Sequence, residues 1–107
     1  MVGGFSMCTP PSRLEKQSIL DLAVKYSEWP PANWLHTKAQ EGNKVKARIG
    51  GDFFYPNSIT ESFNGHDVLL IAGGVGINPL ASIFFHINDL KCKTLLDSSI
   101  PLNSYIF

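Results

Sequence analysis

Apolar and polar residues alternate along two segments in the first half of the chain, which is the periodicity of a β-strand. In residues 18–26, Leu20, Leu22, Val24 and Tyr26 alternate with Asp21, Ala23 and Lys25. Residues 44–49 alternate throughout. The pattern predicts two half-buried strands, with a short helix over residues 33–40 between them that Gly42 would end. Residues 1–16 and 56–66 are predicted to be irregular.

The second half begins with a pattern typical of a strand buried on both faces and followed by a helix. Residues 68–72 form a continuous apolar run, as in a parallel sheet. After a glycine turn, helical spacing predicts a helix over residues 79–90, with Asn78 as its cap. Its apolar face comprises Leu80, Ile83, Phe84, Ile87 and Leu90. Residues 93–96 are predicted to begin a second strand, and the tail after Asp97 has no clear pattern.

Composition and charge narrow the class of protein. With 107 residues, 44% of them hydrophobic and 17% charged, the chain has the composition of a soluble globular protein. Its net charge is zero, and no basic cluster suggests a nucleic-acid partner. Cys8 and Cys92 form no Cys-x-x-Cys pair, so neither a zinc site nor a redox pair is expected. No apolar stretch is long enough to span a bilayer, and no secretory signal or transit peptide is expected.

The glycine turn is the strongest chemical signal in the sequence, which reads Ile71-Ala72-Gly73-Gly74-Val75-Gly76-Ile77-Asn78-Pro79. Gly74 and Gly76 remove the side chains that would keep a pyrophosphate away from the backbone. The first N–H groups of the following helix lack intrahelical partners and favour an anion. A buried strand, a glycine turn and a capped helix together predict a site for a nucleotide diphosphate.

Two other interpretations of the turn remain open. It can be a strand-to-helix connection without a ligand, or a small anion-binding module that uses residues 73–79 alone. Asp97 lies 21 positions after Gly76, near where a Rossmann fold carries its ribose-binding acid, although a loop aspartate is the commoner explanation.

The turn also departs from the Rossmann pattern, because Pro79 stands where the third glycine would be. With that proline it resembles the nicotinamide-binding turn of the ferredoxin–NADP⁺ reductase-type flavoproteins, Gly-Gly-x-Gly-x-x-Pro. Upstream, Gly3-Gly4-Phe5-Ser6 resembles the flavin motif of that family, Arg-x-Tyr/Phe-Ser/Thr. The resemblance covers roughly residues 2–96.

The resemblance implies a role for each matching residue. Phe5 would pack against the flavin ring, and Ser6 would hydrogen-bond near its reactive nitrogen and serve as the catalytic residue. Val24 and Lys25 would belong to the second flavin-contacting strand, and Trp34 to the segment near the flavin pyrophosphate. NAD(P) would be bound by Gly73, Gly74, Val75, Gly76, Ile77, Asn78 and Pro79. Catalysis would be the orientation of two cofactors, NAD(P) and FAD.

The implied fold is an α+β fragment with two parts. Residues 1–66 would be part of an antiparallel FAD-binding β-barrel, and residues 67–107 the first β-α-β of a parallel-sheet nicotinamide-binding domain, truncated after its second strand. The implied function is hydride transfer between NAD(P)H and FAD in the mitochondrion, with an unknown electron acceptor. Gly3 departs from the family, which has an arginine there for a flavin phosphate. The alternative is a truncated, non-catalytic product that binds neither cofactor stably.

Overall fold

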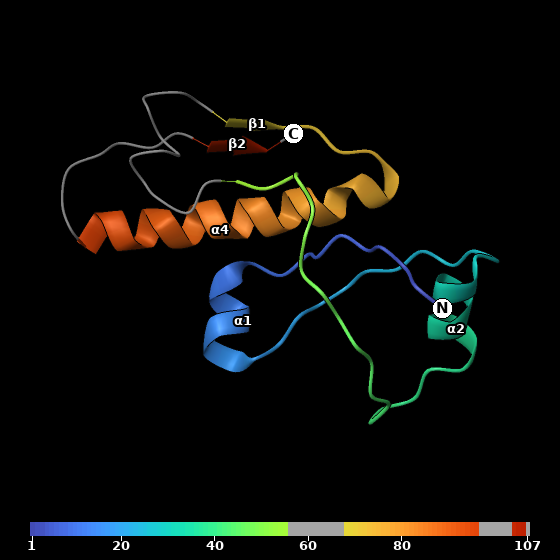
Figure 1. Ribbon diagram of the computed structural model, residues 1–107. Coiled ribbons are helices and arrows are strands. Elements are labelled where there is room, and N and C mark those ends of the chain that lie inside the picture. The colour runs from blue at the N-terminus through green and yellow to red at the C-terminus, as the bar shows by residue number, and fades with distance from the viewer. Residues whose placement is uncertain (56–67, 97–103, 107) are drawn as a thin grey trace.

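The computed structural model of the chain describes residues 1–55, 68–96 and 104–106. In chain order the helices and strands are α1 (Pro11–Gln17), α2 (Pro30–Thr37), β1 (Val68–Leu70), the 3₁₀ helix η1 (Gly74–Gly76), α4 (Ile77–Leu96) and β2 (Ser104–Ile106). Figure 1 shows α4 as the longest element, with β1 and β2 on one side of it and the N-terminal segments on the other.

β1 and β2 form a parallel pair with α4 between them in the sequence. Val68, Leu69 and Leu70 are aligned with Ser104, Tyr105 and Ile106. The prediction that the strand at residues 68–72 is buried on both faces is wrong. Leu70 lies beside α4, but Leu69 is 61% exposed and Ile71, beyond the strand, is 79% exposed. Only the side towards α4 is therefore covered by the described residues.

α4 is longer than the sequence pattern predicted. It begins at Ile77, so Asn78 lies inside its first turn rather than at its cap, and it continues to Leu96. The strand predicted at residues 93–96 is therefore wrong. No glycine or proline interrupts residues 80–96, and helix formers such as leucine and lysine allow the helix to continue. The second strand, β2, comes instead from the tail, where the sequence showed no pattern.

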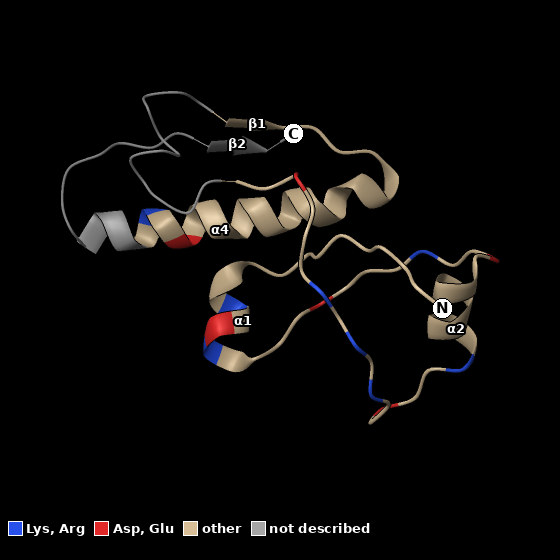
Figure 2. Cartoon of the chain, viewed as in Figure 1, with Lys and Arg blue, Asp and Glu red and all other residues tan. Residues whose placement is uncertain are grey.

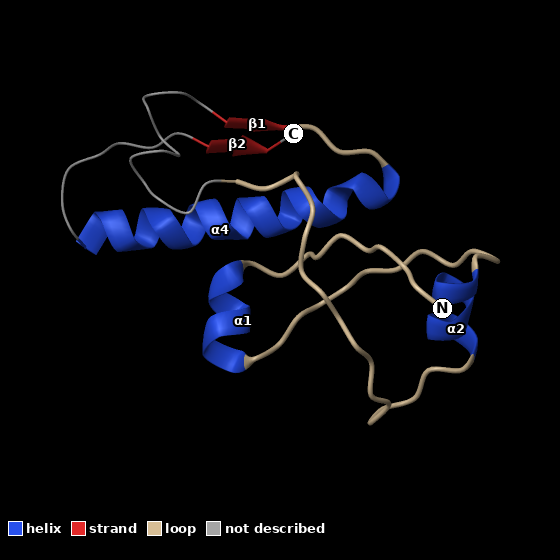
Figure 3. Ribbon diagram, in the orientation of Figure 1, coloured by secondary structure: helices blue, strands red, loops and turns tan. Residues whose placement is uncertain are grey.

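The first half contains two short helices joined by loops (Figure 3). The strands predicted at residues 18–26 and 44–49 are absent from the described part of the chain. Alternation of apolar and polar residues favours a strand only where a neighbouring strand and an apolar surface are available. In residues 44–49 the apolar side chains of Val45 and Ile49 are more than 60% exposed, so they do not pack on such a surface. Whether the first half belongs to a barrel stays a prediction.

The helices in the first half begin at prolines. α1 lies in a segment predicted to be irregular, and it starts at Pro11 and ends at Ser18, whose φ is +54°. α2, predicted over residues 33–40, starts at Pro30 and ends at Thr37. Proline suits the first turn of a helix because its missing N–H would have no intrahelical partner there. The domain boundary predicted near residues 64–67 and the loop at 56–66 lie outside the described residues.

The N-terminal segment packs against α4 through a small interface that is partly polar. Ile87 and Leu90 of α4 are buried, as the predicted apolar face requires. The Ser82 hydroxyl donates to the carbonyl oxygen of Thr9 at 2.7 Å, and Ser12 donates to the carboxylate of Asp89. The radius of gyration is 16.3 Å, against about 13 Å for a compact domain of this length. The chain is therefore loosely packed.

Candidate functional site

The glycine turn connects β1 to α4 through the single 3₁₀ turn η1. Gly74 has a φ of +54°, which is in the left-handed region that favours glycine. The N–H of Gly76 donates to the carbonyl oxygen of Gly73 at 3.0 Å, and the N–H of Ile77 donates to the carbonyl oxygens of Gly74 and Val75. These bonds join the turn to the first residue of α4, so the turn and the helix form a continuous unit.

The turn is open to solvent on the side where a ligand would approach. A Cβ atom added to Gly73, Gly74 or Gly76 would have nothing within 4 Å. Val75 is 55% exposed and Ile77 is 52% exposed. Within the described chain, the N–H groups of Gly74 and Val75 have no hydrogen-bond acceptor. Two backbone donors and open space around three glycines are what a phosphate group needs.

The chain around the turn carries no charged side chain, so the local electrostatic contribution comes from the helix. Residues 68–88 contain no lysine, arginine, aspartate or glutamate. In Figure 2 the charged residues of α4 lie in its C-terminal half, away from the turn. The aligned peptide dipoles of a 20-residue helix place a partial positive charge at its first turn. The turn is thus suited to an anion, without a cationic side chain that would select one.

Two residues of the predicted site support the turn from inside the first turn of α4. Asn78 is only 7% exposed, and its amide Nδ2 donates to the carbonyl oxygen of Ala23 at 2.6 Å. Pro79 is half-buried. The sequence assigned Asn78 to helix capping and cofactor binding. In the structure, Asn78 is not the cap, and its side chain holds the turn against the N-terminal segment; its role in cofactor binding stays a prediction. No feature of the sequence indicated Ala23 as the acceptor.

The Asn78 contact brings the two predicted halves of the site together. Ala23 precedes Val24, one of the predicted flavin residues, and the carbonyl oxygen of Val24 accepts a hydrogen bond from Nε2 of His36 at 2.8 Å. The His36 ring in turn lies edge-on to Tyr26, with ring centroids 5.7 Å apart. A continuous path of contacts thus runs from the glycine turn through residues 23–26 to α2.

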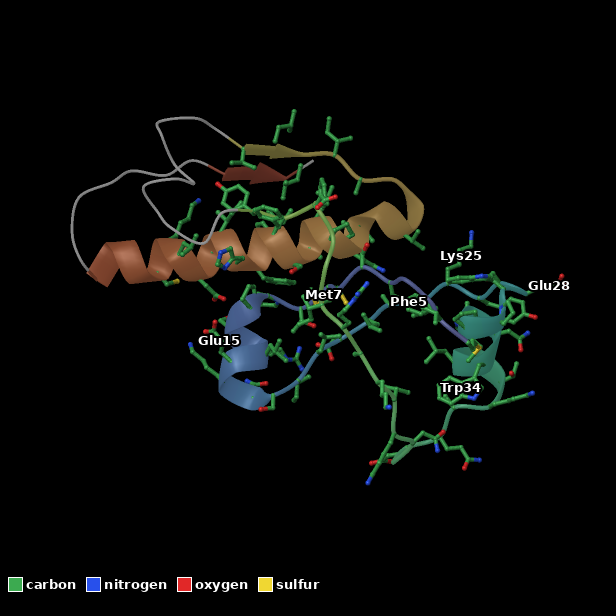
Figure 4. All side chains as sticks on the ribbon, viewed as in Figure 1. Phe5, Met7, Glu15, Lys25, Glu28 and Trp34 are labelled. Carbon is green, nitrogen blue, oxygen red and sulfur yellow. The ribbon has the colours of Figure 1, made fainter. Side chains whose placement is uncertain are left out.

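The remaining predicted flavin residues do not gather into one pocket. Phe5 is half-buried and packs against Trp29, with ring centroids 6.0 Å apart, while Ser6 and Lys25 are exposed. Trp34 lines an open pocket of about 290 Å³. In Figure 4 Lys25 and Trp34 lie on opposite sides of α2, and Phe5 lies between α2 and the centre of the molecule.

A second pocket lies beside the glycine turn, and the sequence did not predict it. Its volume is about 240 Å³ and it is mainly apolar, lined by Leu70, Ala72, Ile77, Leu80, Ala81, Phe84 and Phe85. The sequence signal was present, because these residues flank the turn in the apolar strand and on the apolar side of the helix.

Other groups with reactive potential are scattered. Cys8 is half-buried, with its Sγ donating to the carbonyl oxygen of Asp21 at 3.3 Å, and Cys92 is exposed. The Nε2 atom of His86 is buried, and it has no hydrogen-bond partner among the residues that the structure describes. Within the part of the chain that is described, no three His, Cys, Asp or Glu side chains could hold a metal ion. No described helix is long and apolar enough to cross a membrane. Asp97 lies outside the described residues.

A strand, an open glycine turn and the exposed start of a long helix are features that phosphate-binding strand–turn–helix units share. The chain is similar to three curated proteins called "Oxidoreductase NAD-binding domain-containing protein 1". Identity is 46% over 93 residues with the Danio rerio protein, 48% over 89 with that of Xenopus laevis and 46% over 90 with that of Homo sapiens. The matches cover 87%, 83% and 84% of this chain.

The similarity is confined to a part of those relatives. The matched region accounts for 34% of the Danio rerio protein and 28% of each of the other two, so the chain spans about a third of their length. No protein-family model matches the chain, and no solved structure gives a significant match. The names of these relatives describe an oxidoreductase with an NAD-binding domain. The relationship to the ferredoxin reductase-type flavoproteins stays a prediction.

Proposed function

We propose that this chain carries the nicotinamide-dinucleotide-binding turn of an oxidoreductase. The single observation that carries the proposal is the open turn at residues 73–76. There, among the described residues, two backbone N–H groups have no acceptor at the start of a 20-residue helix. The names of the relatives, which state an NAD-binding domain, support the same cofactor.

The residues present fit a dinucleotide. Gly73, Gly74 and Gly76 would let the backbone approach the pyrophosphate, and the N–H groups of Gly74 and Val75 would donate to its oxygens. Asn78 would keep the turn in place through its hydrogen bond to Ala23. When bound, the cofactor would supply a hydride donor or acceptor at its nicotinamide ring. The chain would contribute binding and orientation.

The finer parts of the proposal rest on the resemblance alone. It gives hydride transfer as the reaction and the mitochondrion as the location. The cofactor it gives is NAD(P), and residues 68–88 carry no charged side chain that would read a 2′-phosphate. FAD is the hydride partner that the resemblance implies, but the residues it assigns to a flavin site, Phe5, Ser6, Lys25 and Trp34, do not gather into one pocket.

A titration of the purified chain with NADH, followed by nicotinamide fluorescence, tests the proposal. The informative variant is Gly76→Ala, because its new methyl group meets open space in the free protein but stands where the pyrophosphate would approach. We expect saturable NADH binding that Gly76→Ala weakens at least about tenfold, a loss of about 1.4 kcal/mol. Gly50→Ala is the matched control, because Gly50 also has nothing within 4 Å and no positive φ.

The possible outcomes separate the three interpretations of the turn. Binding that is weakened by Gly76→Ala but not by Gly50→Ala, at equal melting temperatures, supports the dinucleotide site. Binding of inorganic pyrophosphate without binding of NADH would indicate an anion-binding module instead. If neither ligand binds, the turn is a structural connection and the proposal is wrong.

A second candidate is a non-catalytic product, and the exposed surface favours it. The chain exposes 8564 Å², whereas a compact protein of 11.8 kDa exposes about 5,900 Å². An under-packed chain loses part of its binding energy in ordering itself around a ligand. Failure of NADH to bind to a chain that is shown by circular dichroism to be folded would favour this candidate.

A further inference from the structure

The region that resembles a flavin site is residues 3–36, and several of its groups contact one another: Phe5 packs on Trp29, and His36 bonds to the carbonyl oxygen of Val24. We infer that this region is a packing unit that supports the glycine turn and that it does not hold a flavin. The inference rests on Gly3, Phe5, Val24 and His36, and it holds whether or not the turn binds NADH.

Gly3 occupies the position at which the resembled family has its phosphate-binding arginine. A Cβ atom at Gly3 would lie 2.7 Å from Cβ of Pro31 and 3.0 Å from its Cγ, which is closer than real Cβ contacts allow. Pro31 is buried in the first turn of α2, and its ring is rigid, so it cannot rotate away. Glycine is therefore required at this position so that α2 can pack against the N-terminal segment.

Phe5 is occupied by the same packing. Its ring lies 3.0 Å from the Cβ that Gly3 lacks, and on another side it contacts Trp29. The tilt of 54° between the Phe5 and Trp29 rings is an aromatic packing arrangement. A flavin ring stacked on Phe5 would have to compete with Trp29 for this aromatic surface.

The second flavin-contacting segment is also engaged internally. The carbonyl oxygen of Val24 accepts a hydrogen bond from His36, and the neighbouring carbonyl oxygen of Ala23 accepts one from Asn78. Lys25 lies on the opposite side of α2 from Trp34, so these two predicted flavin contacts do not converge (Figure 4). Together these contacts tie α2 and residues 23–24 to the glycine turn, and this gives the unit its supporting role.

The test is a titration of the whole 107-residue chain with FAD and with FMN, followed by quenching of flavin fluorescence. NADH binding is measured in parallel on the same preparation. We expect no saturable quenching and a colourless protein after gel filtration. Flavin that stays bound in a one-to-one ratio would overturn the inference. The NADH result reports on the proposed function separately, so the two ideas can fail independently.

Two arginine variants make the test sharper. If Gly3 is a packing position, Gly3→Arg lowers the melting temperature and gains no flavin binding. Gly4→Arg is the matched control, because Gly4 has nothing within 4 Å of its added Cβ, and we expect its melting temperature to be unchanged. Gly3→Ala replaces Gly3→Arg if the latter does not fold, and we expect it also to melt earlier than wild type. A Gly3→Arg variant with unchanged melting temperature and new FAD affinity would show that the site is a flavin site that lacks its anchor, and the inference would be wrong.

Discussion

The conformation of Gly74 is the feature of the turn most sensitive to a single methyl group. Its φ of +54° lies in the left-handed region, where an L-side chain costs about 1–2 kcal/mol. We therefore expect Gly74→Ala to lower the free energy of unfolding by about 1 kcal/mol, measured by urea denaturation. Gly73→Ala is the control, because Gly73 has an extended φ of −134° and open space around it. Equal stabilities of the two variants would contradict the strained conformation of the turn.

Asn78 makes a contact that the sequence did not predict, the hydrogen bond to the carbonyl oxygen of Ala23. Asn78→Ala would leave the carbonyl oxygen of Ala23 without its donor in a partly buried place, which costs about 1–3 kcal/mol. We expect a matching loss in urea denaturation and weaker NADH binding, because the turn would no longer be held against residues 23–24. Asn88→Ala is the control, because Asn88 has the same side chain on the same helix and is only half-buried. If both variants are equally stable, the Asn78 contact does not position the turn.

At the scale of helices and strands, the sequence pattern predicted correctly those elements that depend on neighbouring residues in the chain. The existence of α4 and its buried residues Ile87 and Leu90 follow from helical spacing of apolar residues. The glycine turn also lies where its composition placed it. The bounds were less well predicted, because η1 runs directly into α4 and makes Asn78 a helical residue. The local sequence pattern did not predict that the 3₁₀ turn of η1 continues directly into α4.

The errors arose where structure depends on residues far away in the chain. Residues 18–26 have the alternation of a strand, yet their carbonyl groups at Asp21, Ala23 and Val24 accept hydrogen bonds from side chains of other segments. β2 lies in a segment whose sequence has no strand pattern. It is a strand because its backbone pairs with that of β1. The close contact between Gly3 and Pro31 could not be foreseen, since it depends on how α2 docks.

Asp21 contacts α1 through Arg13 and the segment before α1 through Thr9, and we expect these two contacts to contribute differently to stability. Thr9 is 5% exposed and its hydroxyl bonds both the N–H and the carbonyl oxygen of Asp21, so we expect Thr9→Val to cost about 1–3 kcal/mol. The ion pair of Arg13 with Asp21, at 2.7 Å, is 46% and 44% exposed. Arg13→Met should therefore cost no more than about 1 kcal/mol, and less in high salt. Urea denaturation of both variants at low and high salt measures the difference, and a larger loss for Arg13→Met would reverse this ranking.

At the scale of the whole molecule, the chain has more exposed surface than a compact domain. In the described part of the chain, the buried hydrophobic side chains are Ala32, Ile87 and Leu90, which is a small core. The accessible surface of 8564 Å² exceeds the roughly 5,900 Å² of a compact protein of this mass. The relatives are about three times longer than the matched region, so their additional residues are available to cover such a surface.

The apolar surface around β1 should be detectable with a dye that binds exposed hydrophobic groups. Three apolar side chains in this part of the chain are more than half exposed: Leu69 in β1, Ile71 just after it and Val75 in the glycine turn. We expect the dye ANS to fluoresce strongly with the native chain, and Ile71→Ser to reduce the signal because it removes the most exposed of these three apolar side chains. Val45→Ser is the control, since Val45 is 69% exposed in a loop before β1. If both variants reduce the fluorescence equally, the dye does not bind specifically beside the turn and the prediction is wrong. If only Ile71→Ser reduces it, the surface beside the glycine turn is the uncovered part of the fold.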